Sequence, residues 1–172
     1  LAEATAWIEN GDPRPWFCMI NVFDVHHPYT PDPEARDRWV AEYDGPMDGY
    51  VFRPDRYKPG YQPPDVDDRH PPDLYAAEMW PLDQRVDAFL ARLDLDGSNT
   101  AVLMTADHGE AFGEGDVYGH DDILEPQVSV PLLLRIPGDT SRAQDSDAPV
   151  SGVDVTATLL SLAGAEPHPT TS

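Results

Sequence analysis

Two short segments place histidine beside carboxylates in a way that could hold a metal ion and an anionic substrate. Residues 24–29 read Asp-Val-His-His-Pro-Tyr, and residues 107–110 read Asp-His-Gly-Glu. Carboxylate oxygen and imidazole nitrogen both bind divalent cations, and imidazole is suited to acid–base chemistry near neutral pH. A single Asp-His pair in a loop is more often an ordinary surface turn. Two such pairs make a shared site the better hypothesis.

Each segment follows an apolar run of strand length. Residues 15–23 and 100–105 are predicted strands, and residues 130–136 form a third apolar run. Helices are predicted at residues 2–10, 34–43, 73–93 and 153–163, and the last of these is bounded by Ser151 and Gly164. Strands alternating with helices indicate an α/β fold with a parallel or mixed sheet. Ligands of such sheets bind at the carboxyl ends of strands, where both histidine segments fall.

The composition excludes several kinds of partner. The 172 residues carry 32 Asp and Glu against 11 Lys and Arg, a net charge of -21. Such a chain repels nucleic acid and anionic membranes, and it lacks the roughly 18 consecutive apolar residues of a membrane span. The excess of aspartate over lysine indicates a halophile-type surface and favours the cytoplasm of a high-salt cell. A signal peptide upstream of Leu1 stays open, and Cys18, as the single cysteine, excludes an internal disulfide.

The longer pattern resembles the sulfatase family of the alkaline phosphatase superfamily. Residues 100–135 contain an apolar strand, Ala-Asp-His-Gly-Glu, a glycine-rich loop, Gly-His and Val-Pro-Leu, in the order typical of that family. Residues 24–31 resemble its D-x-H-x-P-Y-x-P motif. Residues 153–164 resemble its C-terminal helix, with Ala157 where proline is usual. The resemblance implies an alkaline-phosphatase-like α/β sandwich, with a mostly parallel central sheet and helices on both faces, present here in part.

The same resemblance assigns roles to four residues. Asp107 and His108 would bind one divalent metal ion, commonly calcium, with manganese or magnesium as alternatives. His26 would act as the general acid that assists the leaving oxygen. His120 would donate to the non-bridging oxygens of the ester and stabilise their charge.

The other candidate residues have plainer interpretations. His27 occupies the variable position of its motif and is expected to be structural. Glu110 is expected to be a solvated loop carboxylate. His70 and His168 match no motif and are expected to be exposed.

The implied function is hydrolysis of a small-molecule or carbohydrate sulfate ester. The sequence lacks the C/S-x-P-x-R motif that carries the nucleophile in this family. We therefore expect residues 1–172 to be one partial catalytic domain, with residues 31–72 as a proline-rich surface excursion, and to be inactive alone. A phosphodiesterase or phosphonate monoester hydrolase, or a non-catalytic acidic cation-binding module, remains an alternative. The substrate and the oligomeric state stay open.

Overall fold

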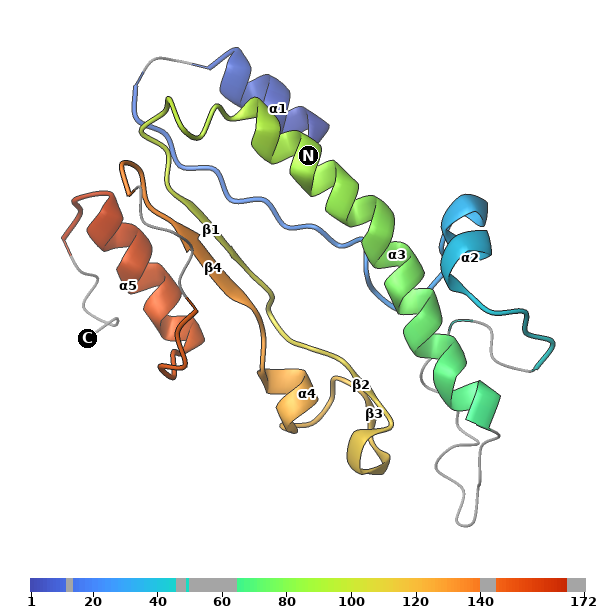
Figure 1. The fold of residues 1–172 in the computed structure, drawn as a ribbon. Coiled ribbons are helices and arrows are strands. Elements are labelled where there is room, and N and C mark those ends of the chain that lie inside the picture. The colour runs from blue at the N-terminus through green and yellow to red at the C-terminus, as the bar shows by residue number, and fades with distance from the viewer. Residues whose placement is uncertain (12–13, 46–48, 50–64, 140–144, 167–172) are drawn as a thin grey trace. The chain divides into compact units, whose positions relative to one another are not determined.

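The computed structural model describes residues 1–11, 14–45, 49, 65–139 and 145–166 (Figure 1). These residues form two compact units. Unit 1 comprises Leu1–Asp94 and His108–Ser129, and unit 2 comprises Leu95–Asp107 and Val130–Ser172. No described helix is long and apolar enough to cross a membrane.

Three helices organise unit 1: α1 (Ala2–Glu9), α2 (Pro33–Trp39) and α3 (Asp65–Arg92). The Asp32 carboxylate caps α2 by accepting a hydrogen bond of 2.9 Å from the backbone N–H of Ala35, and Pro33 occupies the first turn. Both shorter helices contact α3. An ion pair between Arg92 and Glu9 links α1 to α3.

Helix α3 is longer than the sequence pattern predicts. It begins eight residues before the predicted Asp73 and includes Pro71, Pro72 and Pro81. One side of α3 carries an apolar stripe whose members are half-buried, while Asp83, Gln84 and Arg85 between them are exposed. The stripe consists of Leu82, Val86, Phe89, Leu90 and Leu93.

The prediction of a strand at residues 15–23 was wrong. The segment runs alongside α3 without a strand assignment (Figure 1), and its residues 20–24 line a shallow hollow together with Arg85 and Phe89 of that helix. Its apolar composition favours burial, but a strand also needs a neighbouring backbone to pair with. No described residue of unit 1 supplies one, and Phe17, Met19 and Phe23 are 70–82% exposed.

A small core holds the middle of unit 1 together. Tyr29 and Leu74 are each only 1% exposed, and the fully buried alanines are Ala35, Ala77 and Ala111. The side chains packed around them are Val40, Tyr75, Phe112 and Tyr118. We call this group the Tyr29 core.

The glycine-rich segment of unit 1 forms a short hairpin instead of an open loop. Strands β2 (Ala111–Phe112) and β3 (Tyr118–Gly119) pair antiparallel around a 3-10 turn, Glu114–Asp116. Helix α4 (Glu125–Val128) follows. Gly109 lies close against it, since a Cβ at this position would sit 2.0 Å from the carbonyl oxygen of Pro126. Only glycine fits that approach.

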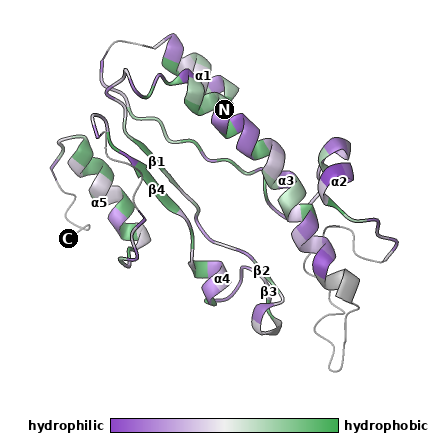
Figure 2. Cartoon of the chain, in the orientation of Figure 1, coloured by the Kyte–Doolittle hydropathy of each residue, from purple (hydrophilic) through white to green (hydrophobic). Residues whose placement is uncertain are grey.

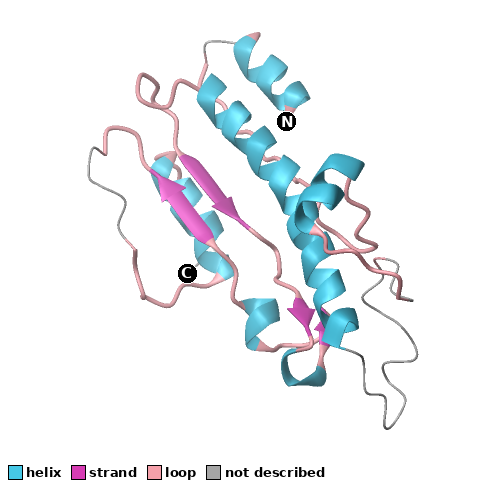
Figure 3. Cartoon of the chain, turned by 45° about the vertical axis from the view of Figure 1, so that its right-hand side comes forward, coloured by secondary structure: helices cyan, strands magenta, loops and turns pink. Residues whose placement is uncertain are grey.

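Unit 2 contains β1 (Val102–Thr105), β4 (Leu132–Arg135) and α5 (Gly152–Leu162). Both predicted apolar runs are strands, and they pair antiparallel (Figure 3), as a mixed sheet allows. Helix α5 confirms its prediction: the backbone N–H of Ser151 donates to the Asp154 carboxylate at 2.7 Å, and Gly164 adopts φ +66° after the last turn.

The whole is a partial α/β arrangement of helices and small sheets. The hydrophobic residues of β1 and β4 stand out in Figure 2. The predicted excursion at residues 31–72 begins with α2 and ends in α3, while residues 46–48 and 50–64 lie outside the described residues.

Candidate active site

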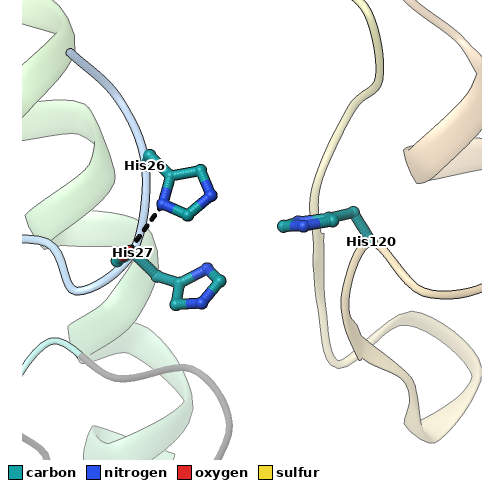
Figure 4. A group of neighbouring side chains, drawn as sticks. All are labelled: His26, His27 and His120. Atoms are coloured by element: carbon teal, nitrogen blue, oxygen red, sulfur yellow. Dashed lines mark hydrogen bonds between the residues drawn. The ribbon is translucent and has the colours of Figure 1, made fainter. Parts of the chain in front are cut away.

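The structure brings His26 and His120 together within unit 1. Their ring centroids are 5.9 Å apart, and the ring of His27 lies 4.5 Å from the first and 5.7 Å from the second. All three are half-buried. Figure 4 shows the His26 and His27 rings on one segment, facing His120 on another. The two residues to which the family resemblance assigns catalytic roles are therefore neighbours in the fold.

Three contacts fix the segment that carries His26. Asp24 forms an ion pair with Arg85 of α3. The backbone N–H of Thr30 donates to the Glu78 carboxylate at 2.6 Å, and that of Tyr29 donates to the carbonyl of Gly49 at 2.9 Å. The segment is thus fastened on both sides of its histidines, so His26 is presented by a constrained turn.

A buried glutamine fixes the segment that carries His120. Gln127 is 2% exposed, and its amide donates to the carbonyl of Gly119 at 2.8 Å. Its side-chain oxygen accepts from the backbone N–H of Leu124 at 3.2 Å. The end of β3 is therefore tied to the start of α4, and His120 directly follows the tied residue. Nothing in the spacing of Gln127 indicated this role.

Glu110 connects the Tyr29 core to the histidines, which corrects its interpretation as a solvated carboxylate. Its side chain is 10% exposed, and it accepts a hydrogen bond of 2.7 Å from the hydroxyl of Tyr29. Its second oxygen lies 3.2 Å from Nδ1 of His120. A carboxylate in this position accepts the Nδ1 proton, which orients the ring and leaves Nε2 to act on a ligand.

Burial, and the contact with Glu110, raise the pKa of Tyr29 far above its ordinary value. The hydroxyl therefore stays protonated and remains a donor to Glu110 throughout the physiological range. Desolvation by burial, followed by the charge of neighbouring His26, lowers the pKa of His27. His27 is consequently a neutral imidazole at neutral pH.

The predicted metal ligands differ in their surroundings. His108 is exposed, and its ring stacks on His120 with centroids 4.1 Å apart. Its Nδ1 donates to the carbonyl of Gly109 at 2.8 Å, which leaves Nε2 as the nitrogen available for a metal. Asp107 is also exposed and is the last residue of its stretch of unit 2. Carboxylate oxygen and imidazole nitrogen are both ligand types of divalent cations, and both side chains are accessible to solvent.

Two other histidines, His70 and His168, were expected to be exposed. His70 was expected to be exposed, but it is 3% exposed and stacks on Tyr43 with ring centroids 3.8 Å apart. Its place in the first part of α3, which the pattern assigned to the loop, explains the difference. His168 lies outside the described residues.

Comparison with known proteins places the chain in a family. The Sulfatase family model matches residues 1–165, nearly the whole chain and both histidine segments. The chain belongs to the sulfatase family. That membership carries with it the alkaline-phosphatase-like α/β fold, of which the described helices and small sheets are a part.

Curated relatives support the same family at low identity. The chain is 27% identical over 163 residues to "Uncharacterized sulfatase YidJ" of Escherichia coli, an alignment covering 89% of this chain and 32% of the relative. It is 28% identical over 170 residues to an "Ulvan-active sulfatase" of Formosa agariphila, covering 94% and 31%. A "Choline-sulfatase" of Rhizobium meliloti is 29% identical over 178 residues, covering 91% and 33%.

The chain thus spans about a third of the length of these relatives. No solved structure matches it.

Proposed function

We propose that this chain supplies the leaving-group and anion-binding part of the active site of a sulfate-ester hydrolase. The observation that carries the proposal is the meeting of His26 and His120, from distant parts of the sequence, with Glu110 placed behind His120. If these histidines were needed only for packing, no carboxylate would be required beside Nδ1 of His120.

His26 acts as the general acid. The carbonyl oxygen of His27 lies 2.7 Å from Nδ1 of His26 and accepts its proton, so Nε2 is the nitrogen that faces the ester. A protonated Nε2 gives its proton to the leaving oxygen as the sulfur–oxygen bond breaks. General acid catalysis of this kind contributes about 10²–10⁴ in rate.

His120 stabilises the charge of the sulfuryl group. Glu110 accepts from Nδ1 and orients the ring, and the opposite nitrogen, when it carries a proton, donates to a non-bridging oxygen. The Tyr29 hydroxyl holds the carboxylate in place from the core side. A donor positioned in this way is worth about 10²–10³ in kcat.

Asp107 and His108 would hold a divalent cation, for which calcium is our first choice. When bound, the cation neutralises the anionic ester and lowers the barrier to attack at sulfur. The two residues are an incomplete ligand set for calcium, which takes about six to eight oxygen-rich ligands. We propose that the other ligands and the nucleophile come from sequence outside residues 1–172, and that this chain alone does not turn over substrate.

The substrate class follows from the family and stays broad. The names of two relatives refer to ulvan and to choline. We propose a sulfate ester of a small molecule or carbohydrate as the substrate of the complete domain.

The direct test compares nitrophenyl sulfate with bis-nitrophenyl phosphate in a complete domain containing this chain. We expect faster hydrolysis of the sulfate, and loss of it on His26→Ala or His120→Ala. A preference for the phosphodiester would assign the site to that related chemistry instead. Full activity in both variants would refute the site, and turnover by the 172 residues alone would refute the proposed division of the active site.

A further inference from the structure

Three imidazoles converge at the proposed catalytic pair. His26, His27 and His120 each place a ring nitrogen within 4.8 Å of the nitrogens of the other two (Figure 4). In the described part of the chain this is the one group of three or more histidine, cysteine or acidic side chains found so close together. Two of the three are the proposed catalytic residues, and His27 has no role in that chemistry.

The hydrogen bonds of two of the rings indicate which nitrogen carries the proton and which the lone pair. Nδ1 of His26 donates to the carbonyl of His27, so Nε2 of His26 carries the lone pair in the neutral ring. Nδ1 of His120 lies beside the Glu110 carboxylate and donates to it, so in the neutral ring of His120 the lone pair is also on Nε2. Metal-binding histidines usually have this support, with the outer nitrogen bonded to a carbonyl or a carboxylate.

We propose that His26, His27 and His120 form a binding site for a transition-metal ion of the Zn²⁺ class, made of different residues from the Asp107 and His108 site. Three neutral imidazoles suit Zn²⁺, Ni²⁺ or Cu²⁺, whereas a site made of nitrogen ligands alone does not suit Ca²⁺ or Mg²⁺, which prefer oxygen. Zn–N bonds place tetrahedral ligand nitrogens about 3.4 Å apart. Binding therefore requires the ring nitrogens, now within 4.8 Å of one another, to move closer, and water fills the fourth position.

The proposed metal site has a consequence for binding of the sulfate ester. An ion held by Nε2 of His26 and Nε2 of His120 occupies the same nitrogens that would contact a sulfuryl group. Binding of the ion and binding of the ester therefore exclude one another. This consequence rests on the proposed function, whereas the metal site itself does not.

The test uses Co²⁺ as a spectroscopic stand-in for Zn²⁺, added to the 172-residue chain in excess Ca²⁺. The Ca²⁺ fills oxygen-only sites, which a chain of net charge -21 offers in number. We expect the intense visible absorption of four-coordinate, nitrogen-ligated Co²⁺, abolished by added Zn²⁺. Loss of one ligand in His27→Gln should raise the dissociation constant more than about 10-fold, and Glu110→Gln should raise it about 10–100-fold through the supporting bond.

Asp107→Asn is the matched control, because it alters the other metal site and should leave Co²⁺ binding by the three histidines unchanged. Thermal unfolding without metal checks that every variant is folded. The proposal is overturned if the parent chain shows no such absorption, if folded His27→Gln binds Co²⁺ like the parent, or if Asp107→Asn abolishes binding.

Excess inorganic sulfate tests the exclusion separately. We expect sulfate to weaken Co²⁺ binding, because both need His26 and His120. Intact Co²⁺ binding that is insensitive to sulfate would leave the metal site standing and refute its overlap with an ester site.

Discussion

The two units of the chain differ in how deeply they bury their apolar residues. In unit 1, Tyr29, Leu74 and Ala111 are almost completely buried. In unit 2 no described residue is fully buried, and residues 132–134 of β4 are 39–54% exposed. A two-stranded pair has little stability of its own. The side chains that need fixed positions, the three histidines and Glu110, all belong to the unit with a core.

The difference indicates which unit holds its site residues in fixed positions. Each histidine segment of unit 1 is adjacent to a buried anchor, Tyr29 for residues 24–30 and Gln127 for residues 118–120. Side chains held by buried neighbours lose fewer conformations when a ligand binds, because they were ordered beforehand. The strand pair of unit 2 has a hydrogen-bond register but no buried side chain to fix it.

The largest effect should come from the histidines themselves. In a complete domain, His26→Ala should lower kcat by about 10²–10⁴ and His120→Ala by about 10²–10³. Steady-state kinetics with nitrophenyl sulfate measures both. A matched surface change in unit 2, Val150→Thr at a 62% exposed position, should leave kcat unchanged. An equal loss in all three variants would remove the distinction between the units.

Glycine substitutions separate the units by stability. Gly109→Ala drives a Cβ against the carbonyl of Pro126, and overpacking of this kind costs about 1–3 kcal/mol. Gly152→Ala, at the first residue of α5 in unit 2, meets no atom within 4 Å and should stabilise the helix by up to about 1 kcal/mol. Denaturant unfolding of the two variants should thus move in opposite directions. Equal shifts would mean that the close contact at Gly109 is not rigid.

Tyr29→Phe tests whether the core of unit 1 orders its site. The change leaves Glu110 without the hydroxyl donor and should cost about 1–3 kcal/mol of unfolding free energy. In the complete domain it should also lower kcat, since Glu110 then orients His120 less well. Tyr75→Phe is the control, because this ring packs on Tyr29 while the described residues provide its hydroxyl no hydrogen bond. If both variants lose stability but neither loses kcat, the Tyr29–Glu110 contact is structural only.

The smallest effect is a pH dependence at Glu78, which holds the backbone of Thr30. Burial raises the pKa of Glu78 above its ordinary value of 4.5. A carboxyl group with a raised pKa in the folded state contributes stability at low pH, and this is lost as the pH rises through the folded pKa. Glu78→Gln should therefore gain stability relative to the parent as the pH rises from about 4 upward, as measured by unfolding across pH.

The sequence predicted elements whose signals are local. Helix α5 has a capping residue, an acidic first turn and a terminal glycine, and all three are found in place. The apolar runs at residues 100–105 and 130–136 are strands. The run at residues 15–23 carries an equally apolar signal but is not a strand, because pairing depends on a partner segment and not on composition.

Motifs in the sequence picked out His26, His108 and His120, whose rings lie near one another, and their roles stay a prediction. The residues that support them were not predictable in this way. The roles of Glu110 and Gln127 depend on hydrogen bonds to residues brought near by folding, which sequence spacing does not encode. His70 was predicted to be exposed because it is polar and lies near prolines, but it is buried against Tyr43.

The place of Tyr29 has a consequence for how this protein can change. The same side chain fills the centre of unit 1 and holds the carboxylate behind His120. A mutation that improves packing around the ring therefore also shifts the partner of a proposed catalytic group. Variants selected only for higher stability near this position should therefore also change in activity. Variants selected for new substrates should recover lost stability through compensating changes at Leu74, Tyr75 or Phe112.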